Sequence, residues 1–183
     1  MGQARVARLQ AEYDVVVAWR GVEIHPEIPP EGLHWPPYLR TRFGGMSDML
    51  REEAQMAGLP MVIPEVIPKS RRALEATEYA REQGKYEVFH ELVWRKFYGE
   101  GEDLGSWEIL RSAADAVGLD AAEMERRTES GVYTAVIDNH LQELATLGAT
   151  GVPLFIFNGM YAIIGLQPYA AFQEVMAHIE QDG

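Results

Sequence analysis

Residues 150–159 read Thr150-Gly151-Val152-Pro153-Leu154-Phe155-Ile156-Phe157-Asn158-Gly159, and this stretch decides the fold. Pro153 stands at the start of an apolar run, where the N–H that proline lacks can be tolerated in a strand. The dipeptide Asn158-Gly159 separates this run from a second one, 161–164, and Asn-Gly between apolar runs is the strongest short signal for a β-hairpin. The sequence therefore predicts two strands, 154–157 and 161–164, joined by a tight turn.

The peptide bond before Pro153 has two possible forms. A trans proline at the beginning of a strand is the ordinary interpretation. We expect a cis bond between Val152 and Pro153, because a cis proline forces a tight turn and leaves the polar backbone groups of the preceding residue exposed. Such groups can pair with an extended ligand.

The rest of the chain predicts a helical block between a strand and this hairpin. Gly2 to Gln10 favours a short helix, and Asp14 to Ile24, which is rich in β-branched residues, favours a strand. From 47 to 146 the apolar spacing is helical, with Ser106 and Asp120 as candidate N-caps. Pro168 opens a last helix that ends near Gln181.

Composition limits the function. The chain has 183 residues, of which 47% are hydrophobic, enough for one compact domain with a real core. Its formal net charge is −12, and this acidity argues against nucleic acid and membrane surfaces as partners. The absence of a continuous apolar segment at the N-terminus and of any run long enough to span a bilayer predicts a cytoplasmic protein.

Common catalytic and cofactor motifs are missing from the sequence. The five histidines lie in separate segments, so we expect no metal site, and no glycine-rich phosphate loop or serine elbow is present. We therefore expect no cofactor. The chain also contains no cysteine, which excludes a thiol nucleophile of its own.

At several segments the sequence resembles the DsbA-like thioredoxin-fold oxidoreductases, and specifically their FrnE-type branch. The segments that carry the resemblance are Trp19-Arg20, His25-Pro26-Glu27-Ile28-Pro29-Pro30-Glu31-Gly32, Ala80-Arg81-Glu82-Gln83-Gly84, Phe89-His90, Gly101-Glu102-Asp103-Leu104, Ala114 to Leu119, Leu147-Gly148-Ala149-Thr150-Gly151-Val152-Pro153, Asn158-Gly159 with Tyr161, and Gly165-Leu166-Gln167-Pro168. The resemblance implies an α/β, thioredoxin-like fold: a single domain, 1–183, whose core is 1–45 with 147–183 and whose helical insertion is 46–146.

In that family a Cys-Pro-x-Cys pair at the end of the first strand performs the chemistry, and the helix that follows lowers the pKa of one thiol. The start of this sequence, Met1-Gly2-Gln3-Ala4-Arg5, resembles the residues just after that pair. The first strand and both cysteines have no counterpart. We expect a start at an internal methionine rather than a genuine loss, because the first strand is central in such a sheet and its absence leaves two strands unpaired.

The resemblance also implies where a substrate binds. The expected substrate-facing residues are Thr150, Gly151, Val152 and Pro153, with Gln167 close by and the Trp35-Pro36-Pro37-Tyr38 loop as a possible cap. An aromatic loop folded onto its own core is an equally good interpretation of Trp35. No catalytic residue is expected in the chain. The expected partner is a protein or small-molecule thiol or disulfide, and exposed strand edges allow a homodimer.

Two other functions stay open. The first is a glutathione-using enzyme of the same superfamily, similar to kappa-class glutathione transferases and 2-hydroxychromene-2-carboxylate isomerases, which use a serine in place of the cysteine pair. The second is a peptide-binding thioredoxin-fold protein without catalysis. Gly165-Leu166-Gln167-Pro168 lacks the acidic residue and the arginine that tend to follow the glutamine in the glutathione-using enzymes.

Overall fold

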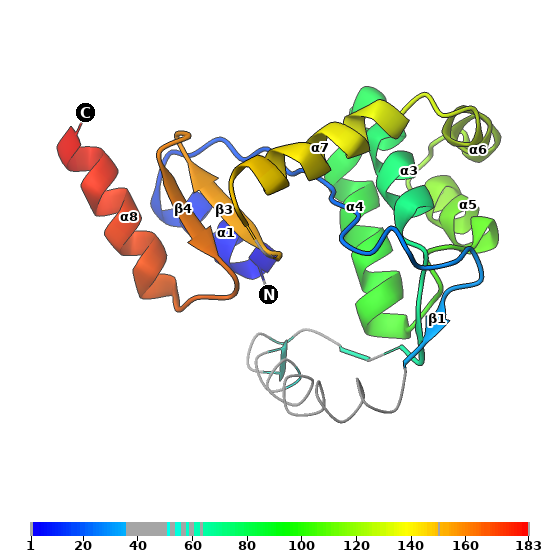
Figure 1. Cartoon of the computed structure of the whole chain (residues 1–183), viewed down its shortest axis with the longest axis horizontal. Helices are drawn as coiled ribbons and strands as arrows, with labels where there is room; N and C mark the ends of the chain where they lie inside the picture. Colours follow the sequence, from blue (N-terminus) through cyan, green and yellow to red (C-terminus); the bar gives the residue numbers. More distant parts are fainter. Residues whose placement is uncertain are drawn as a thin grey trace. The chain divides into compact units, whose positions relative to one another are not determined.

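The computed structural model describes residues 2–35, 51, 54–55, 58, 61–62, 64–149 and 151–182. Its elements, with the labels of Figure 1, are α1 (Gly2–Glu12), β1 (Leu33–His34), β2 (Val66–Ile67), α3 (Arg71–Glu82), α4 (Tyr86–Trp94), the π-helical turn η1 (Arg95–Gly99), α5 (Trp107–Ala116), α6 (Ala121–Glu129), α7 (Thr134–Thr146), β3 (Leu154–Phe157), β4 (Tyr161–Ile164) and α8 (Tyr169–Asp182). The first helix, the hairpin and the last helix are confirmed near their predicted positions. No helix in the described ranges has the length and apolar character that crossing a bilayer requires.

The chain divides into two compact units. The hairpin unit consists of Met1–Arg20 and Gln142–Gly183, and the helical unit is Gly21–Leu141. These boundaries differ from the expected ones, which joined 1–45 with 147–183. Residues 21–35 belong to the helical unit because they are bonded to it: His140 Nδ1 lies 3.0 Å from the backbone oxygen of Gly21, and β1 pairs with β2.

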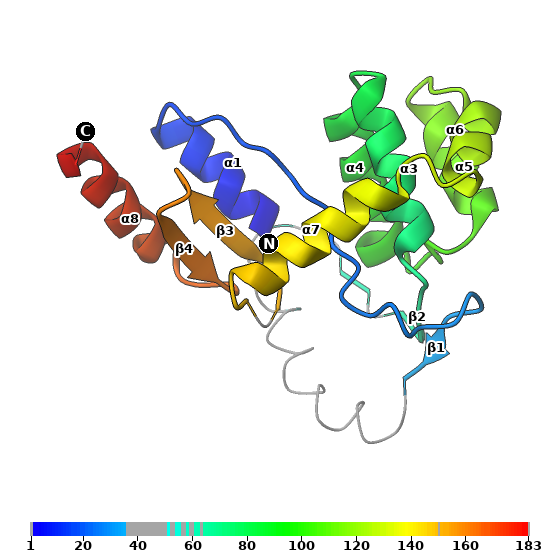
Figure 2. The same cartoon turned by 45° about the horizontal axis from the view of Figure 1, so that its top comes forward.

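The hairpin unit is built on an antiparallel pair of strands. Leu154 lies opposite Ile164 and Phe157 opposite Tyr161. Asn158, Gly159 and Met160 connect the strands, and the first two have φ values of 50° and 71°, in the left-handed region that tight hairpin turns use. Helix α8 lies along β4 (Figures 1 and 2).

Phe172 of α8 is the centre of the hairpin unit's core. Its ring is fully buried and lies 4.8 Å from the ring centroid of Phe155 and 6.0 Å from that of Phe157. Alternate residues of a strand share a face, so Phe155 and Phe157 reach Phe172 together. Leu9 of α1, Ile163 and Met176 complete the buried cluster. The core therefore holds α1, the hairpin and α8 together.

The helical unit has a separate core. Its largest fully buried side chains are Phe89 of α4, Leu110 of α5 and Met124 of α6. Of the two predicted N-caps, the Asp120 side chain accepts a hydrogen bond from Glu123 N at 2.9 Å, whereas the Ser106 side chain makes no cap bond. The helix pattern of the sequence is thus confirmed, and a local cap defines where α6 begins.

The strand predicted over Asp14–Ile24 is not formed. No backbone hydrogen bond between described residues involves Asp14 to Ala18, and β3 and β4 pair only with each other. The exposure nevertheless alternates as in an extended chain, with half-buried residues at 13, 15, 17 and 19 and exposed ones at 14, 16, 18 and 20. The prediction was wrong because β-propensity gives an extended backbone, while a strand also needs a hydrogen-bonded neighbour.

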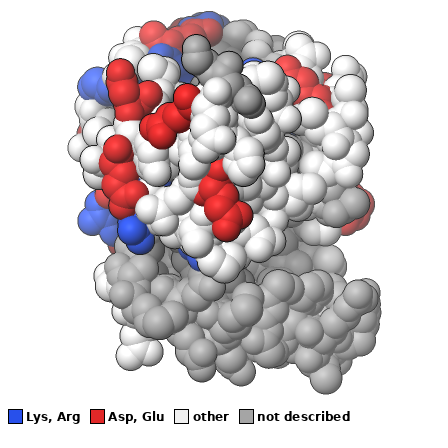
Figure 3. All heavy atoms as spheres, turned by 90° about the vertical axis from the view of Figure 1, so that its left-hand side faces the viewer, with Lys and Arg blue, Asp and Glu red and all other residues white. Residues whose placement is uncertain are grey.

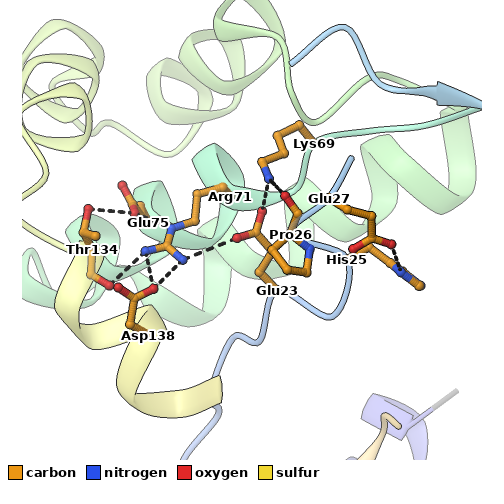
Figure 4. Close-up of polar contacts among 9 residues, drawn as sticks. All are labelled: Glu23, His25, Pro26, Glu27, Lys69, Arg71, Glu75, Thr134 and Asp138. Atoms are coloured by element: carbon orange, nitrogen blue, oxygen red, sulfur yellow. Dashed lines mark hydrogen bonds and ion pairs between the residues drawn. The ribbon is translucent and has the colours of Figure 1, made fainter. Parts of the chain in front are cut away.

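A network of ion pairs fastens residues 23–27 to α3 and α7 within the helical unit (Figure 4). Arg71 Nε donates to Glu75 Oε1 at 2.6 Å, and Arg71 Nη2 donates to Asp138 Oδ1 at 2.8 Å and to Thr134 O at 2.9 Å. Burial lowers the pKa of Arg71, but the hydrogen bonds to Glu75 and Asp138 outweigh this and raise it. Arg71 is therefore charged at every ordinary pH.

Glu23 is the most buried acid of this network. Its side chain is only 5% exposed, and its Oε2 lies 3.4 Å from Arg71 Nη1. Lys69 Nζ lies 2.9 Å from the other oxygen, Oε1, as an ion pair without hydrogen-bond geometry, while donating to Pro26 O at 2.6 Å. A buried carboxylate needs such partners because desolvation is costly.

His90 of α4 is held neutral by its surroundings. It stacks on Tyr86 at a centroid distance of 5.3 Å, and its Nε2 accepts a hydrogen bond from Trp94 Nε1 at 2.7 Å. Burial, together with the charge of Arg81, lowers the pKa of His90 to about 4, against a smaller opposing effect of Glu87. A protonated imidazole has no acceptor nitrogen, so the Trp94 bond requires the neutral form.

We expect this histidine to make stability fall below neutral pH. The pKa of His90 is 6.5 when unfolded and about 4 when folded, so the unfolded chain binds the extra proton between these values. The contribution of His90 to the free energy of unfolding should be complete above pH 6.5 and should fall by at most about 3 kcal/mol as the pH falls to 4. Urea unfolding at a series of pH values measures the loss, and in His90→Gln the slope between pH 6.5 and 5 should flatten. An unchanged slope in that variant contradicts the assignment.

Candidate functional site

The Val152-Pro153 loop is fixed at one end of the hairpin. The peptide bond between Val152 and Pro153 is cis. Gly165 N donates to Pro153 O at 2.8 Å, and Gln167 N donates to Gly165 O at 3.1 Å. The loop before β3 is therefore bonded directly to the turn that follows β4, which brings Pro153 and Gln167 into one small network.

Helix α1 begins beside this loop. A methyl group added at Gly2 would lie 3.7 Å from Pro153 Cβ and 3.4 Å from Phe155 Cζ, so the start of the helix touches the proline. In the first turn, Arg5 Nε donates to Gln167 O at 2.7 Å. The first N–H groups of a helix have no partner within the helix and form its positive end. The loop thus lies next to a locally electropositive helix terminus.

Val152 is the part of the loop that a ligand can reach. Its side chain is 48% exposed, and within the described ranges neither Gly151 nor Val152 takes part in a backbone hydrogen bond. Pro153 has no N–H, and its oxygen already accepts from Gly165. The backbone N–H and C=O of Val152 are therefore the groups available to pair with an extended partner.

A polar cluster fixes α1 against the start of α8. Arg8 Nε donates to Glu12 Oε1 at 2.7 Å, and the Tyr169 hydroxyl donates to Glu12 Oε2 at 3.0 Å. The guanidinium of Arg8 also lies 3.9 Å above the ring of Tyr169. The hydrogen bond from Arg8 lowers the pKa of Glu12, and burial raises the pKa of Tyr169. Glu12 is therefore ionised and the Tyr169 hydroxyl protonated at neutral pH, so the hydrogen bonds that hold α1 against α8 are kept.

The remaining predicted site residues are Trp35 and Thr150. Trp35 belongs to the helical unit, where its Nε1 donates to Pro64 O at 3.0 Å. Its role in substrate binding stays a prediction. Thr150 and the loop residues Pro36, Pro37 and Tyr38 lie outside the described residues.

Sequence reasoning did not name Gly2 or Arg5 as site residues. Gly2 approaches Pro153, which stands 151 positions later in the sequence, and Arg5 reaches Gln167 across a separation of 162. The one available signal was the resemblance of the N-terminus to the helix that follows the cysteine pair. Neither residue type by itself predicts a site.

Two kinds of catalytic group are not found near this site. The chain has no cysteine, and among the residues that the structure covers no three side chains of His, Asp or Glu gather as metal ligands. What the site offers is a positive helix end, an exposed apolar side chain and a pair of backbone groups.

The chain is similar to several known proteins. The chain is 24% identical to a probable DsbA oxidoreductase from Streptomyces coelicolor, with a TM-score of 0.87 over 100% of this chain and 84% of that one. A 2-hydroxychromene-2-carboxylate isomerase is 18% identical, with a TM-score of 0.75 over 97% of this chain and 86% of that one. The uncharacterised protein YwbO of Bacillus subtilis (strain 168) is 28% identical over 148 residues, 78% of this chain and 72% of YwbO.

The fold predicted from the sequence, thioredoxin-like with a helical insertion, is confirmed by these structures. The sequence profile of the DSBA-like thioredoxin domain matches residues 1–177, nearly the whole chain. The chain belongs to the DsbA-like thioredoxin domain family.

Proposed function

We propose that this protein binds an extended peptide or a small thiol or disulfide at the Val152-Pro153 loop, as a FrnE-type member of its family. The observation that carries the proposal is the state of Val152, which is half-exposed and has no described backbone partner. The next residue, Pro153, touches the start of α1. An extended ligand gains main-chain hydrogen bonds there and places a side chain or sulfur near the helix terminus.

The chain performs no disulfide exchange of its own. In such an exchange a thiolate attacks one sulfur of a disulfide, forms a mixed disulfide and displaces the other sulfur as a thiolate. None of the 183 residues supplies a thiol. Any redox step at this site therefore uses thiols from outside these 183 residues.

The surface charge restricts the ligands. Asp and Glu side chains are spread over the face shown in Figure 3, in keeping with a net charge of −12. Strongly anionic partners are repelled by such a surface. Neutral or basic peptides are the favoured substrates.

The first test separates binding from catalysis. We expect no reduction of insulin by dithiothreitol above the rate in buffer, because the chain cannot form the mixed disulfide. Turbidity measures the reaction, and a cysteine-containing thioredoxin serves as the positive control. Turnover above buffer would assign redox chemistry to groups other than thiols of this chain and would refute the proposal.

A second candidate is a glutathione-using isomerase. It is favoured by the absence of cysteine together with the structural similarity to 2-hydroxychromene-2-carboxylate isomerase. Binding to the folded state raises stability by about 2.7 kcal/mol when the ligand is at a hundred times its Kd. A rise in melting temperature with glutathione, but not with an uncharged peptide, would favour the isomerase. The reverse result supports peptide binding.

A further inference from the structure

Helices α4 and α5 of the helical unit border a cavity of about 360 Å³. Leu92 and Val117 pack against the buried core of the unit and give the cavity an apolar floor. The complete lining consists of Val88, Glu91, Leu92, Arg95, Ala116 and Val117. A volume near the lower end of the range for ligand pockets suits a small molecule, about the size of one amino acid.

The two charged residues of this lining do not pair with each other. Glu91 precedes Arg95 by four residues, which is the spacing and order that favour an ion pair on a helix. Arg71 and Glu75 of α3 have the same spacing, and Arg71 Nε lies 2.6 Å from Glu75 Oε1. Within the described part of the chain, neither the Glu91 nor the Arg95 side chain has an ion-pair or hydrogen-bond partner. The wall of the cavity therefore carries a carboxylate and a guanidinium that are both available to a ligand.

The backbone changes its form at one of these two residues. Arg95 is the first residue of the π-helical turn η1, and Glu100 N donates to Arg95 O across five residues. Single π turns within helices are rare, and they frequently occur at functional sites. The helix is thus irregular where it presents the guanidinium to the cavity.

The neighbouring lysine is already occupied. Lys85 Nζ donates to Val117 O at 2.8 Å and to Gly118 O at 2.7 Å, just after the last residue of α5. Two of the carbonyl groups that a helix end leaves unpaired are therefore satisfied from within the unit. The charges that remain for a ligand in the cavity are those of Glu91 and Arg95.

We propose that this cavity binds a free amino acid with an apolar side chain, such as leucine, in its zwitterionic form. The ammonium group pairs with Glu91, the carboxylate pairs with Arg95, and the side chain covers the apolar floor. Charge-assisted hydrogen bonds are about 2.7–2.9 Å long, so the ligand bridges two side chains that do not reach each other. A residue at either end of a peptide carries only one of the two charges. The proposal is independent of ligand binding at Val152.

A series of ligands tests these contacts without altering the protein. L-Leucine is titrated into the isotope-labelled protein, and the amide resonances of Val88, Leu92 and Val117 should shift with a Kd of about 1 mM or lower. N-acetyl-L-leucine lacks the ammonium charge, L-leucinamide lacks the carboxylate, and glycine lacks the apolar side chain. Each of these three should bind about tenfold more weakly, because each loses one of the three contacts.

Substitutions in the lining test where leucine binds. Glu91→Gln and Arg95→Met each remove one charge and should weaken the binding of leucine about tenfold. Glu87→Gln is the matched control, because Glu87 lies on the same helix and is exposed but does not line the cavity. Ala116→Leu keeps both charges and a good helix former while it fills the cavity, so it should abolish binding. The amide spectrum of each variant shows whether the fold is kept.

The proposal is supported if leucine binds more tightly than all three analogues and if the lining variants, but not Glu87→Gln, weaken it. Cavity amides that do not shift up to about 10 mM leucine, well above the expected Kd, overturn it. Equal binding of N-acetyl-L-leucine or L-leucinamide also overturns it, because the site then does not recognise a zwitterion. Binding that persists in Ala116→Leu places leucine elsewhere and overturns it as well.

Discussion

Replacing Arg71 by methionine should lower the free energy of unfolding by about 3–5 kcal/mol, because the substitution removes the counter-ion of the buried Glu75 and leaves the buried Glu23 with Lys69 as its counter-ion. Glu23 and Glu75 have side chains only 5% and 6% exposed, and both contact this guanidinium. Methionine matches the length of the arginine stem but donates no hydrogen bond. Urea unfolding followed by far-UV circular dichroism measures the change.

An exposed arginine gives the matched control. Arg126 of α6 bonds to Glu123, but its side chain is 67% exposed. Exposed ion pairs contribute less than about 1 kcal/mol, so Arg126→Met should change little. If the two substitutions lowered the free energy of unfolding equally, Arg71 would contribute no more than a surface charge and would not hold residues 23–27 against α3 and α7.

Phe172→Ala should cost about 3–5 kcal/mol, the range found for a large aromatic side chain removed from a core. Phe172 is fully buried and contacts Phe155 and Phe157, two residues of β3, the strand that follows Pro153. The cavity loosens the strand that carries the Val152-Pro153 loop. We therefore expect weaker peptide binding in addition to a lower melting temperature.

The control for this prediction lies in the same unit. Met160, in the hairpin turn, is 69% exposed, and Met160→Ala should change stability by less than about 0.5 kcal/mol. Phe172→Leu should have an intermediate effect because it keeps part of the buried volume. If Phe172→Ala were no more harmful than Met160→Ala, the proposed core of the hairpin unit would be wrong.

Features set by a few neighbouring residues were predictable from the sequence. Asn158-Gly159 determines a turn through its own backbone preferences, and Asp120 caps the helix that starts immediately after it. The hairpin and α6 were therefore found correctly. The resemblance to a family added the arrangement of the helical block within the fold.

Features that join distant residues were not predictable in this way. Arg71 meets Glu23 and Asp138 across 48 and 67 positions, and a single sequence carries no record of such partners. The same holds for Gly2 beside Pro153. The strand expected over 14–24 failed for a related reason, because pairing depends on a neighbour and not on the propensity of Val15, Val16 and Val17 alone.

The most direct test of peptide binding is a titration of the isotope-labelled protein, followed by NMR through its backbone amide resonances. The ligand is the S-carbamidomethylated B chain of insulin, an unfolded peptide whose thiols carry neutral caps. The amides of Gly151, Val152 and Gly165 should shift in a saturable way, while those of the helical unit's core around Leu110 stay unchanged. Saturable shifts confined to other residues, or none at all up to millimolar peptide, would contradict the assignment of Val152-Pro153 as the binding loop.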